Sequence, residues 1–505
     1  MHRRDGRHGR ACRGTGEDGR FRTWLALLVV LALTAGVVAT YRYDLADRWF
    51  PRDPAGPVDP TTVAPPPGLD LPPVTDPAPL AAPLGVEDTI DKAAVRAALA
   101  PYLRDDDLGD HVLAAVSGLS GGPTYTFGRG TAVPASTTKL LTALATLATI
   151  DPATTYATRV VREGRRIVLV GGGDPLLASA PPDADRKAGE PAAWPARADL
   201  TTLARQSAEA LLAAGVTSVR LRYDDSLFTG PAVNPSWPDS YLPDGVVAPI
   251  SALWADQGRP EEGTGRVADP PRAAAEIFAR ELATAGVAVA GRPAPRTAGA
   301  TAEQVAEVRS APVSQLVEHA LLVSDNEATE VLMRHLALAT GAAGSSAEGT
   351  RAVLAVLDRL GVPTQRVRLR DGSGLSRKNL IPPATLLGVL RQAATGAPAL
   401  RPVLTGLPVA GFTGSLTSRF ANGPAEGRGR VRAKTGTLTG VSSLAGVVTT
   451  VGGTPMLFVL MTDEVALADT LDARADLDAA ASALAACACA STASGQEEPP
   501  STVVP

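Results

Sequence analysis

The chain has 505 residues, 45% of them hydrophobic, so it is long enough for about two or three domains and apolar enough to bury a large core. Its 48 basic and 52 acidic residues give a net charge of −4, so no basic field predicts nucleic-acid binding. Three cysteines and five scattered histidines predict neither a disulfide framework nor a metal site. Cys487 and Cys489 lie in an Ala-rich run that favours a buried helix, and they are too close in sequence for an ordinary bridge.

An Arg-rich segment at residues 1–23 is followed by seventeen uncharged residues at 24–40. Seventeen residues is the lower length limit for a membrane-spanning helix, and Val37-x-Ala39 also fits a signal cleavage site. We expect an uncleaved membrane anchor in preference to a cleaved signal peptide. In both cases the preceding arginines predict that the rest of the chain is extracytoplasmic, either anchored to the cell membrane or secreted.

A Pro-rich linker at residues 41–86 separates this segment from the body of the chain. Residues 51–85 contain twelve prolines, which favour a semi-rigid extended spacer. The tail at 491–505 has the composition of a disordered segment. Residues 87–490 are therefore expected to form the folded body.

Within the body, hydrophobic periodicity and turn residues predict an α+β fold with an antiparallel sheet. Residues 155–305 have a different sequence pattern, in which short strand-like runs alternate with Pro/Gly loops. We expect them to form an inserted subdomain. The remaining body is then 87–154 and 306–490. The expected elements are a helix at 89–103, two strands at 111–128, a helix starting at Ser136, helices near 200–214 and 271–286, a helix on each side of a polar spot within 310–340, three strands at 431–463 and a helix at 468–487.

The first candidate for chemistry is Ser136-x-x-Lys139, at the start of the helix that follows residue 133. Residues three apart share a helix face, so the Lys139 amine can reach the Ser136 hydroxyl. A serine needs a base to become a nucleophile, and lysine can lose its proton on burial whereas arginine cannot. The chain has five lysines and 43 arginines, and it keeps a lysine at this position. On its own, the motif is more often an ordinary helix start beside a solvated lysine.

Two further short motifs follow. Ser324-Asp325-Asn326 lies between two helical runs, where local capping is the ordinary interpretation. Its functional interpretation is a second hydroxyl that relays a proton and an amide that holds substrate. Lys434-Thr435-Gly436 lies on a strand, where a glycine lets a ligand backbone approach. Lys434 supplies positive charge there, and Thr435 and Thr437 supply hydroxyls for a carboxylate.

Together, in this order and on these elements, the three motifs form the signature of penicillin-binding proteins and class A β-lactamases. The chain resembles the D-alanyl-D-alanine carboxypeptidase/endopeptidases of the penicillin-binding-protein-4 type, peptidase family S13. The long segment between Ser136 and Ser324 supports this resemblance, as do stretches similar to that family at 171–177, 247–259 and 370–383. The resemblance covers about residues 87–490. It implies the serine β-lactamase/DD-peptidase fold with one inserted subdomain between the first two motifs.

The resemblance also implies acyl transfer on peptidoglycan stem peptides that end in D-Ala-D-Ala, with no metal and no cofactor. Ser136 would be the nucleophile, Lys139 the general base and Ser324 a proton relay. The N–H groups of Ser136 and Thr437 would form the oxyanion hole, and β-lactams would acylate Ser136. The substrate-binding residues would be Asn326, Lys434, Thr435, Gly436 and Thr437. Asp174, Asp371, Ser373 and Asn379 fall in the other matching stretches, and we interpret them as structural.

Several alternatives remain. A class A β-lactamase needs a deacylating Glu four residues before an Asn, and none of the four asparagines has one. A non-catalytic cell-wall binding protein would keep the fold but not the chemistry. A Ser-His-Asp hydrolase is disfavoured because no Gly-x-Ser-x-Gly elbow is present. The sequence leaves open whether carboxypeptidase or cross-link endopeptidase cleavage is the main reaction.

Overall fold

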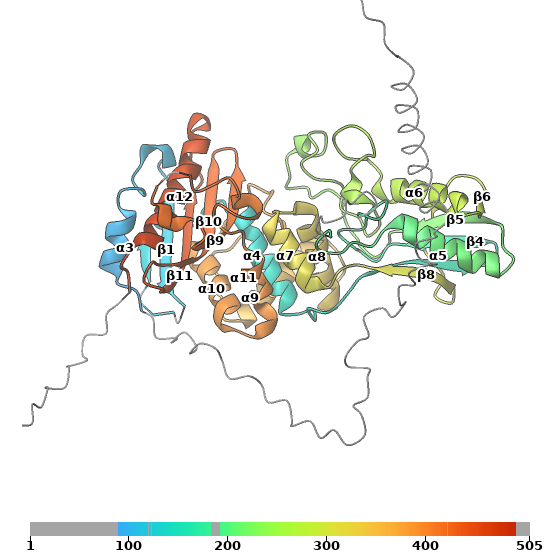
Figure 1. The fold of residues 1–505 in the computed structure, drawn as a ribbon, viewed down its shortest axis with the longest axis horizontal. Helices are drawn as coiled ribbons and strands as arrows, with labels where there is room; N and C mark the ends of the chain where they lie inside the picture. The colour runs from blue at the N-terminus through green and yellow to red at the C-terminus, as the bar shows by residue number, and fades with distance from the viewer. Residues whose placement is uncertain (1–88, 120, 123, 183–191, 422, 491–505) are drawn as a thin grey trace, which may run out of the picture. The chain divides into compact units, whose positions relative to one another are not determined.

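The computed structural model describes residues 89–490 apart from 120, 123, 183–191 and 422, and these described residues belong to one compact unit (Figure 1). The segments expected at 1–23, 24–40, 41–86 and 491–505 lie outside the described residues. Among the helices that are described, none is long and apolar enough to cross a membrane.

A five-stranded antiparallel sheet forms one part of the unit, in the order β2-β1-β11-β10-β9. Its strands are β1 (Val112–Gly118), β2 (Tyr125–Phe127), β9 (Val431–Leu438), β10 (Val441–Thr449) and β11 (Pro455–Thr462). The strand pair at 111–128 and the three strands at 431–463 are therefore confirmed. The first strand of the sheet pairs with the last one, so the sheet joins chain segments that are far apart in sequence.

Both faces of this sheet are buried, because alternate side chains of its central strands pack into two different apolar clusters. On β11, Phe458 and Leu460 face one apolar cluster, and Leu457 and Val459 face another. Side chains on a strand point alternately to opposite faces, so a continuous apolar run indicates a strand that is covered on both sides. The first cluster includes residues of α3 (Lys92–Leu99) and α12 (Thr470–Ala486), and the second includes residues of α4 (Lys139–Leu147) and α10 (Pro383–Thr395). The structure thus has the α+β fold that the sequence predicts.

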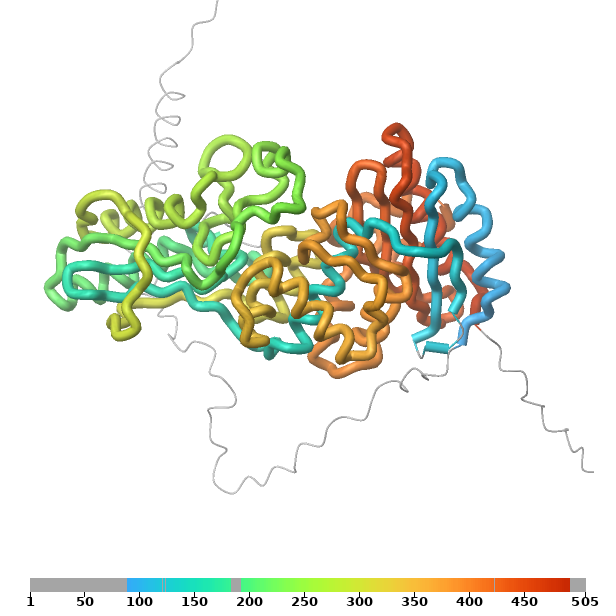
Figure 2. The backbone as a smooth tube through the Cα atoms, turned by 180° about the vertical axis from the view of Figure 1, so that it is seen from behind, coloured from blue at the N-terminus to red at the C-terminus, as the bar shows by residue number. Residues whose placement is uncertain are grey.

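The remaining helices of this part are α7 (Val313–Leu322), α8 (Asn326–Ala339), α9 (Ser346–Arg359) and α11 (Pro402–Thr405). The chain ends of the described body meet, since the Asp91 N–H donates to the Cys489 carbonyl at 2.9 Å. Figure 2 shows the first and last described segments side by side, and α3 contacts α12.

A second, mixed sheet is built from the segment between the first two motifs, in the order β6-β5-β4-β3-β8, with β7 paired to β5. Its strands are β3 (Ala157–Glu163), β4 (Arg166–Val170), β5 (Ser218–Asp224), β6 (Ala288–Val289), β7 (Ala294–Pro295) and β8 (Glu303–Arg309). Helices α5 (Leu200–Ala213) and α6 (Pro270–Thr284) accompany it, and each begins at an Asp that caps a free backbone N–H. The boundary drawn at residue 305 falls inside β8.

The C-terminal cysteines differ from expectation. Helix α12 ends at Ala486, Cys487 turns to extended backbone, and Cys487 and Cys489 form a disulfide with their Cα atoms 5.1 Å apart. We expected both residues within a helix and without a bridge, and both expectations are wrong. The extended backbone after the helix is what brings the two sulfurs within reach.

Candidate active site

The first motif folds as a single 3-10 turn, η2 (Ala135–Thr138), and α4 begins directly after it at Lys139. The helix therefore starts three residues later than the sequence predicts, and Ser136 lies on the turn. The Thr137 hydroxyl donates to the Pro134 carbonyl at 2.7 Å, and the Thr138 hydroxyl donates to the Ala135 carbonyl at 2.8 Å. Ala135 has a φ of 47°, a left-handed conformation that is costly for a residue with a side chain. The turn is thus strained and held by its own threonines.

Lys139 is the centre of the site. Its Nζ atom lies 3.0 Å from Ser136 Oγ, 2.7 Å from Asn326 Oδ1 and 2.7 Å from the Ser373 carbonyl oxygen. The lysine is almost completely buried, with 1% of its surface exposed. Two of these three partners, the amide oxygen and the carbonyl oxygen, can only accept hydrogen bonds. Ser136 is the one partner that can also give a proton to the amine.

Burial lowers the pKa of Lys139 from its ordinary value to about 8, because the charged form loses its hydration. The negative charges of Asp371, Asp325, Glu330 and Glu327 oppose this shift. At pH 7 a lysine with this pKa is neutral in about one molecule in ten, against fewer than about one in a thousand for an exposed lysine. The amine is therefore available as a base near neutral pH.

The second and third motifs meet each other. Lys434 Nζ on β9 donates to Ser324 Oγ at 2.9 Å and to its neighbouring Thr435 carbonyl at 2.9 Å. Ser324 lies in the turn between α7 and α8 with a φ of 61°, a second strained residue. Burial holds the pKa of Lys434 well below its ordinary value, and the nearby charge of Lys139 adds to this effect. All three motifs therefore converge on one site.

The turn that carries Ser324 is fixed by its neighbour Asp325, which caps α8 by accepting from the Ala328 N–H at 2.8 Å. Gln257 Nε2 also donates to Asp325 Oδ2 at 2.6 Å. Burial disfavours the charged form of Asp325, but hydrogen bonds, the largest from His319, keep its pKa below the ordinary value. The sequence correctly predicts local capping at this motif. The same turn therefore caps α8 through Asp325 and also places Ser324 beside Lys434 and Asn326 beside Lys139.

Strand β9 passes very close to the Ser136 turn, η2, at Gly436. A Cβ atom on this residue would lie 2.1 Å from Ser443 Oγ and 2.5 Å from the Pro134 carbonyl oxygen, so no larger residue fits. β9 is the outermost strand of its sheet, and Thr437 is exposed at this edge. Ser415 Oγ lies 2.8 Å from Thr435 Oγ1. No motif in the sequence points to Ser415, so sequence reasoning missed it.

The loop at 370–376 has a larger part in the site than the sequence indicates. Asp371 accepts from the N–H groups of Gly374 and Ser376 and from Asn379 Nδ2, as expected for a structural turn. Ser373, however, offers its carbonyl oxygen directly to Lys139. Because this contact uses a backbone atom, no side-chain pattern could have revealed it. Asp174 contacts none of these site residues, and burial raises its pKa to about 7.

Within the described residues, one group of carboxylates could hold a cation: Asp105, Asp107 and Asp476, whose oxygens lie within 4.8 Å of one another. Burial, together with the charges of its acidic neighbours, raises the pKa of Asp476 to about 6. These residues lie near α12 and apart from the three motifs. They supply nothing to the chemistry of Ser136 and Lys139.

Comparison with known proteins gives a consistent result. The model of the D-Ala-D-Ala carboxypeptidase 3 (S13) family matches residues 95–263 and 257–484. A carboxypeptidase of Mycobacterium tuberculosis is 36% identical over 395 residues, covering 74% of this chain and 81% of the relative. Carboxypeptidase DacB of Mycolicibacterium smegmatis is 33% identical over 450 residues, covering 87% and 91%.

Among solved structures, penicillin-binding protein 4 of Haemophilus influenzae is similar in fold, with a TM-score of 0.63 and 21% identity. The match covers 78% of this chain and 98% of that one. A second structure of the same protein, in complex with a β-lactam, has a TM-score of 0.57 and 22% identity, with coverage of 77% and 98%.

Proposed function

Because the chain belongs to the D-Ala-D-Ala carboxypeptidase 3 (S13) family, we propose that it is a serine carboxypeptidase that removes the terminal D-Ala from peptidoglycan stem peptides. The observation that carries this proposal is the 3.0 Å contact between Ser136 Oγ and the buried Lys139 amine. Two relatives of comparable length are named carboxypeptidases, which supports the reaction class.

In the reacting form Lys139 is neutral, with two N–H bonds and one lone pair. The two N–H bonds go to Asn326 Oδ1 and the Ser373 carbonyl, since these oxygens can only accept. The lone pair then faces the Ser136 hydroxyl and takes its proton as Ser136 Oγ bonds to the penultimate D-Ala carbonyl carbon. Asn326 is thus assigned a role in orienting the base as well as in holding the acyl side of the substrate.

The tetrahedral intermediate places negative charge on the former carbonyl oxygen. The N–H groups of Ser136 and Thr437 stabilise it, a contribution worth about 3–4 kcal/mol per donor. The C–N bond then breaks, and the leaving D-Ala amine takes, through Ser324 Oγ, the proton that Lys139 removed from Ser136. Water then hydrolyses the acyl-Ser136 ester. Thr435, Thr437 and Lys434 bind the terminal carboxylate along the Gly436 backbone. That carboxylate favours the charged form of Lys434, which burial alone disfavours.

β-Lactams mimic the substrate and acylate Ser136 in the same way, but the resulting acyl-enzyme is hydrolysed slowly. The β-lactam complex of the Haemophilus influenzae protein supports this assignment. Fluorescent penicillin should label the wild-type protein and leave Ser136→Ala unlabelled. Fast turnover of a chromogenic cephalosporin would indicate a β-lactamase, and equal labelling of both proteins would indicate no acyl-enzyme at Ser136.

Product analysis separates the two peptidase reactions. Mass spectrometry of digests of a pentapeptide ending in D-Ala-D-Ala should show loss of one alanine from the wild type only. A cross-linked dimer of stem peptides, tested in parallel, reports endopeptidase cleavage. A protein that binds either substrate and converts neither would fit the non-catalytic alternative.

The N-terminal segment at 24–40 is proposed to anchor the protein to the cell membrane, with residues 87–490 outside the cytoplasm. The support is its uncharged sequence after seven arginines, followed by the Pro-rich spacer. Fractionation of cells that express the full chain tests this, because an anchored protein stays with the membranes in high salt. A free, shortened protein in the medium would indicate cleavage instead.

A further inference from the structure

The orientation of Lys139 depends on a backbone oxygen that belongs to the loop at residues 370–376. Of the two acceptors that fix the amine, Asn326 Oδ1 is on a helix, whereas the Ser373 carbonyl is on this loop. The loop also approaches the Ser136 turn, η2, since a Cβ atom on Gly374 would lie 1.9 Å from the Ala135 carbonyl oxygen. A displacement of the loop would therefore release the base and disturb the turn beside it.

Helix α8 holds the loop from the core. Glu330 Oε1 accepts from the N–H groups of Gly372 at 2.9 Å and Ser373 at 2.8 Å, and the glutamate is 1% exposed. Glu330 is four residues after Asn326, so both lie on one face of the same helix. The helix that provides one acceptor for Lys139 therefore also fixes the other acceptor.

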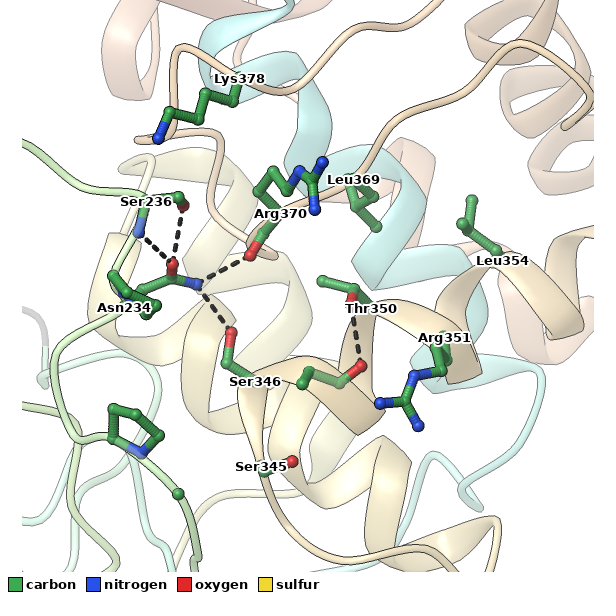
Figure 3. Close-up of a pocket in the computed structure, with 14 residues that line it drawn as sticks. Asn234, Ser236, Ser345, Ser346, Thr350, Arg351, Leu354, Leu369, Arg370 and Lys378 are labelled. Atoms are coloured by element: carbon green, nitrogen blue, oxygen red, sulfur yellow. Dashed lines mark hydrogen bonds between the residues drawn. The ribbon is translucent and has the colours of Figure 1, made fainter.

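Side chains of the inserted segment, residues 155–305, also hold this loop. Trp237 Nε1 donates to Asp371 Oδ2 at 2.7 Å, and this carboxylate in turn binds the N–H groups of Gly374 and Ser376. Asn234 Nδ2 donates to the Arg370 carbonyl at 2.8 Å and to Ser346 Oγ at 2.9 Å (Figure 3). Both donors come from residues 155–305, the proposed subdomain.

A cavity of about 810 Å³ lies beside the Asn234 contacts, lined by Asn234, Ser236, Arg370 and the start of α9 (Figure 3). Open space on this side leaves the Arg370 end of the loop without close packing there, so its Asn234 contact is a directed support. Asp371, Ser373 and Ser376 are buried, and hydrogen bonds fix them within the packed interior.

We propose that Glu330 and Trp237 are positioning residues, which hold the 370–376 loop so that the Ser373 carbonyl fixes Lys139 with its lone pair toward Ser136. The proposal rests on the proposed function, because it assigns a second role within the same site. It gives the inserted segment a part in the reaction that does not require contact with substrate. A misplacement of about 1 Å at a reacting group can cost about 10²-fold in rate.

Glu330 also acts on Lys139 through charge. The charged groups that face it are Asp371 on the loop, Arg334 on its own helix and Lys139 on α4. Burial, and then the charge of Asp371, raise the pKa of Glu330 to about 7. When ionised, Glu330 raises the pKa of Lys139. Glu330→Gln keeps an acceptor oxygen and removes the charge, whereas Glu330→Leu removes both.

The test is the kinetics of Ser136 acylation by penicillin in the full chain, measured by stopped flow so that the acylation rate constant and the dissociation constant are separated. Glu330→Leu and Trp237→Phe should lower the rate constant at least about ten-fold, with dissociation constants within about two-fold of wild type. Glu330→Gln should retain most of the rate and move the acid limb of the pH profile to lower pH.

The matched control is Trp254→Phe. Trp254 is another buried tryptophan of the inserted segment, and its Nε1 donates to the Asp174 carbonyl at 3.0 Å, away from the loop. Equal losses in Trp237→Phe and Trp254→Phe, or a Trp237→Phe loss confined to the dissociation constant, would overturn the proposal. If Glu330→Leu does not fold, Glu330→Gln and the tryptophan pair decide. If wild type is not labelled at Ser136, the proposed function fails instead.

Discussion

Lys139 and Lys434 are both buried amines in one site, yet their partners differ. Lys139 contacts Ser136 and two oxygens that only accept, whereas Lys434 contacts Ser324 and a strand carbonyl. Two positive charges close together in a buried site are unfavourable. If Lys139 is neutral, Lys434 can therefore be protonated when a carboxylate binds beside it. The proposed mechanism accordingly uses Lys139 as the base and Lys434 as the anion-binding group.

Replacement of Lys139 by arginine tests the need for an amine that can lose its proton. Lys139→Arg keeps the positive charge but cannot act as a base, so the acylation rate constant should fall by at least about 10². Penicillin labelling over time measures this. Lys92→Arg is the control because Lys92 is exposed on α3. Wild-type labelling of Lys139→Arg would rule out general-base catalysis by this residue.

The rate of acylation should depend on pH through the same amine. With its pKa at about 8, Lys139 is protonated and inactive below this value, so the rate constant should fall about ten-fold per pH unit at acid pH. Above about pH 8 the neutral form predominates and the rate should level off. Acylation measured between pH 6 and 10 gives the midpoint, and a midpoint near 10 would contradict the depressed pKa.

At the scale of elements, the close approach of β9 to the 3-10 turn is what aligns the third motif with the first. Gly436→Ala would place a methyl group against Ser443 Oγ and the Pro134 carbonyl. Overpacking of this kind typically costs about 1–3 kcal/mol, and the shifted strand should also slow acylation. Urea unfolding and penicillin labelling measure the two effects.

Gly452→Ala serves as the control for this substitution. A Cβ atom there would lie 3.7 Å from the nearest atom outside the adjoining residues, so the change should be within about 0.5 kcal/mol of wild type. Equal effects of the two alanines would show that β9 has room to move.

Elements with strong periodicity could be predicted from the sequence, and elements that depend on tertiary contact could not. The three strands at 431–463 and the helix break within 310–340 have clear apolar patterns and turn residues. The turn before α4 has the composition of a helix start, but threonine–carbonyl bonds within the turn and the close approach of β9 and the 370–376 loop accompany a 3-10 form. The Cys487–Cys489 bridge was missed because alanines continue past the point where the helix ends.

The candidate site was predictable in its motifs but not in its connections. Ser136 and Lys139 lie together as their spacing predicted, and Ser324, Asn326 and Lys434 join them as the family resemblance implied. Ser373 and Glu330 were not predictable as partners of the site, because one uses its backbone oxygen and the other binds backbone N–H groups. Contacts through backbone atoms do not require particular side chains, so they leave no recognisable motif in the sequence.

For the whole molecule, the inserted segment is connected to the rest by buried polar contacts on α8. Gln257 bonds to Asp325, Arg266 pairs with Glu327 at 2.9 Å, and the ring of His335 lies 2.9 Å from the Gly173 carbonyl. These side chains follow each other along one helix. Helix α8 is therefore one structural connection between residues 155–305 and the site of Ser136 and Lys139, beside the contacts of Trp237 and Asn234 with the 370–376 loop.

Protonation of His335 in acid should lower the stability of the folded protein at this connection. Burial lowers its pKa to about 4 against 6.5 in an unfolded chain, so between these values the unfolded state binds the extra proton. Stability is therefore present above pH 6.5 and lost as the pH falls toward 4, by up to about 3 kcal/mol. His335→Gln should show a smaller loss between pH 7 and pH 4.5 in urea unfolding, whereas parallel curves for the two proteins would refute this.

The pairing of β1 with β11 has a consequence for how the chain folds. β1 (Val112–Gly118) finds its central partner only at Pro455–Thr462, so during synthesis the five-stranded sheet cannot close until nearly the whole body has emerged. Such non-local pairing slows folding, since the entropy of closing a long loop is lost before the contacts form. A chain that emerges in this order remains without its central sheet for most of its synthesis.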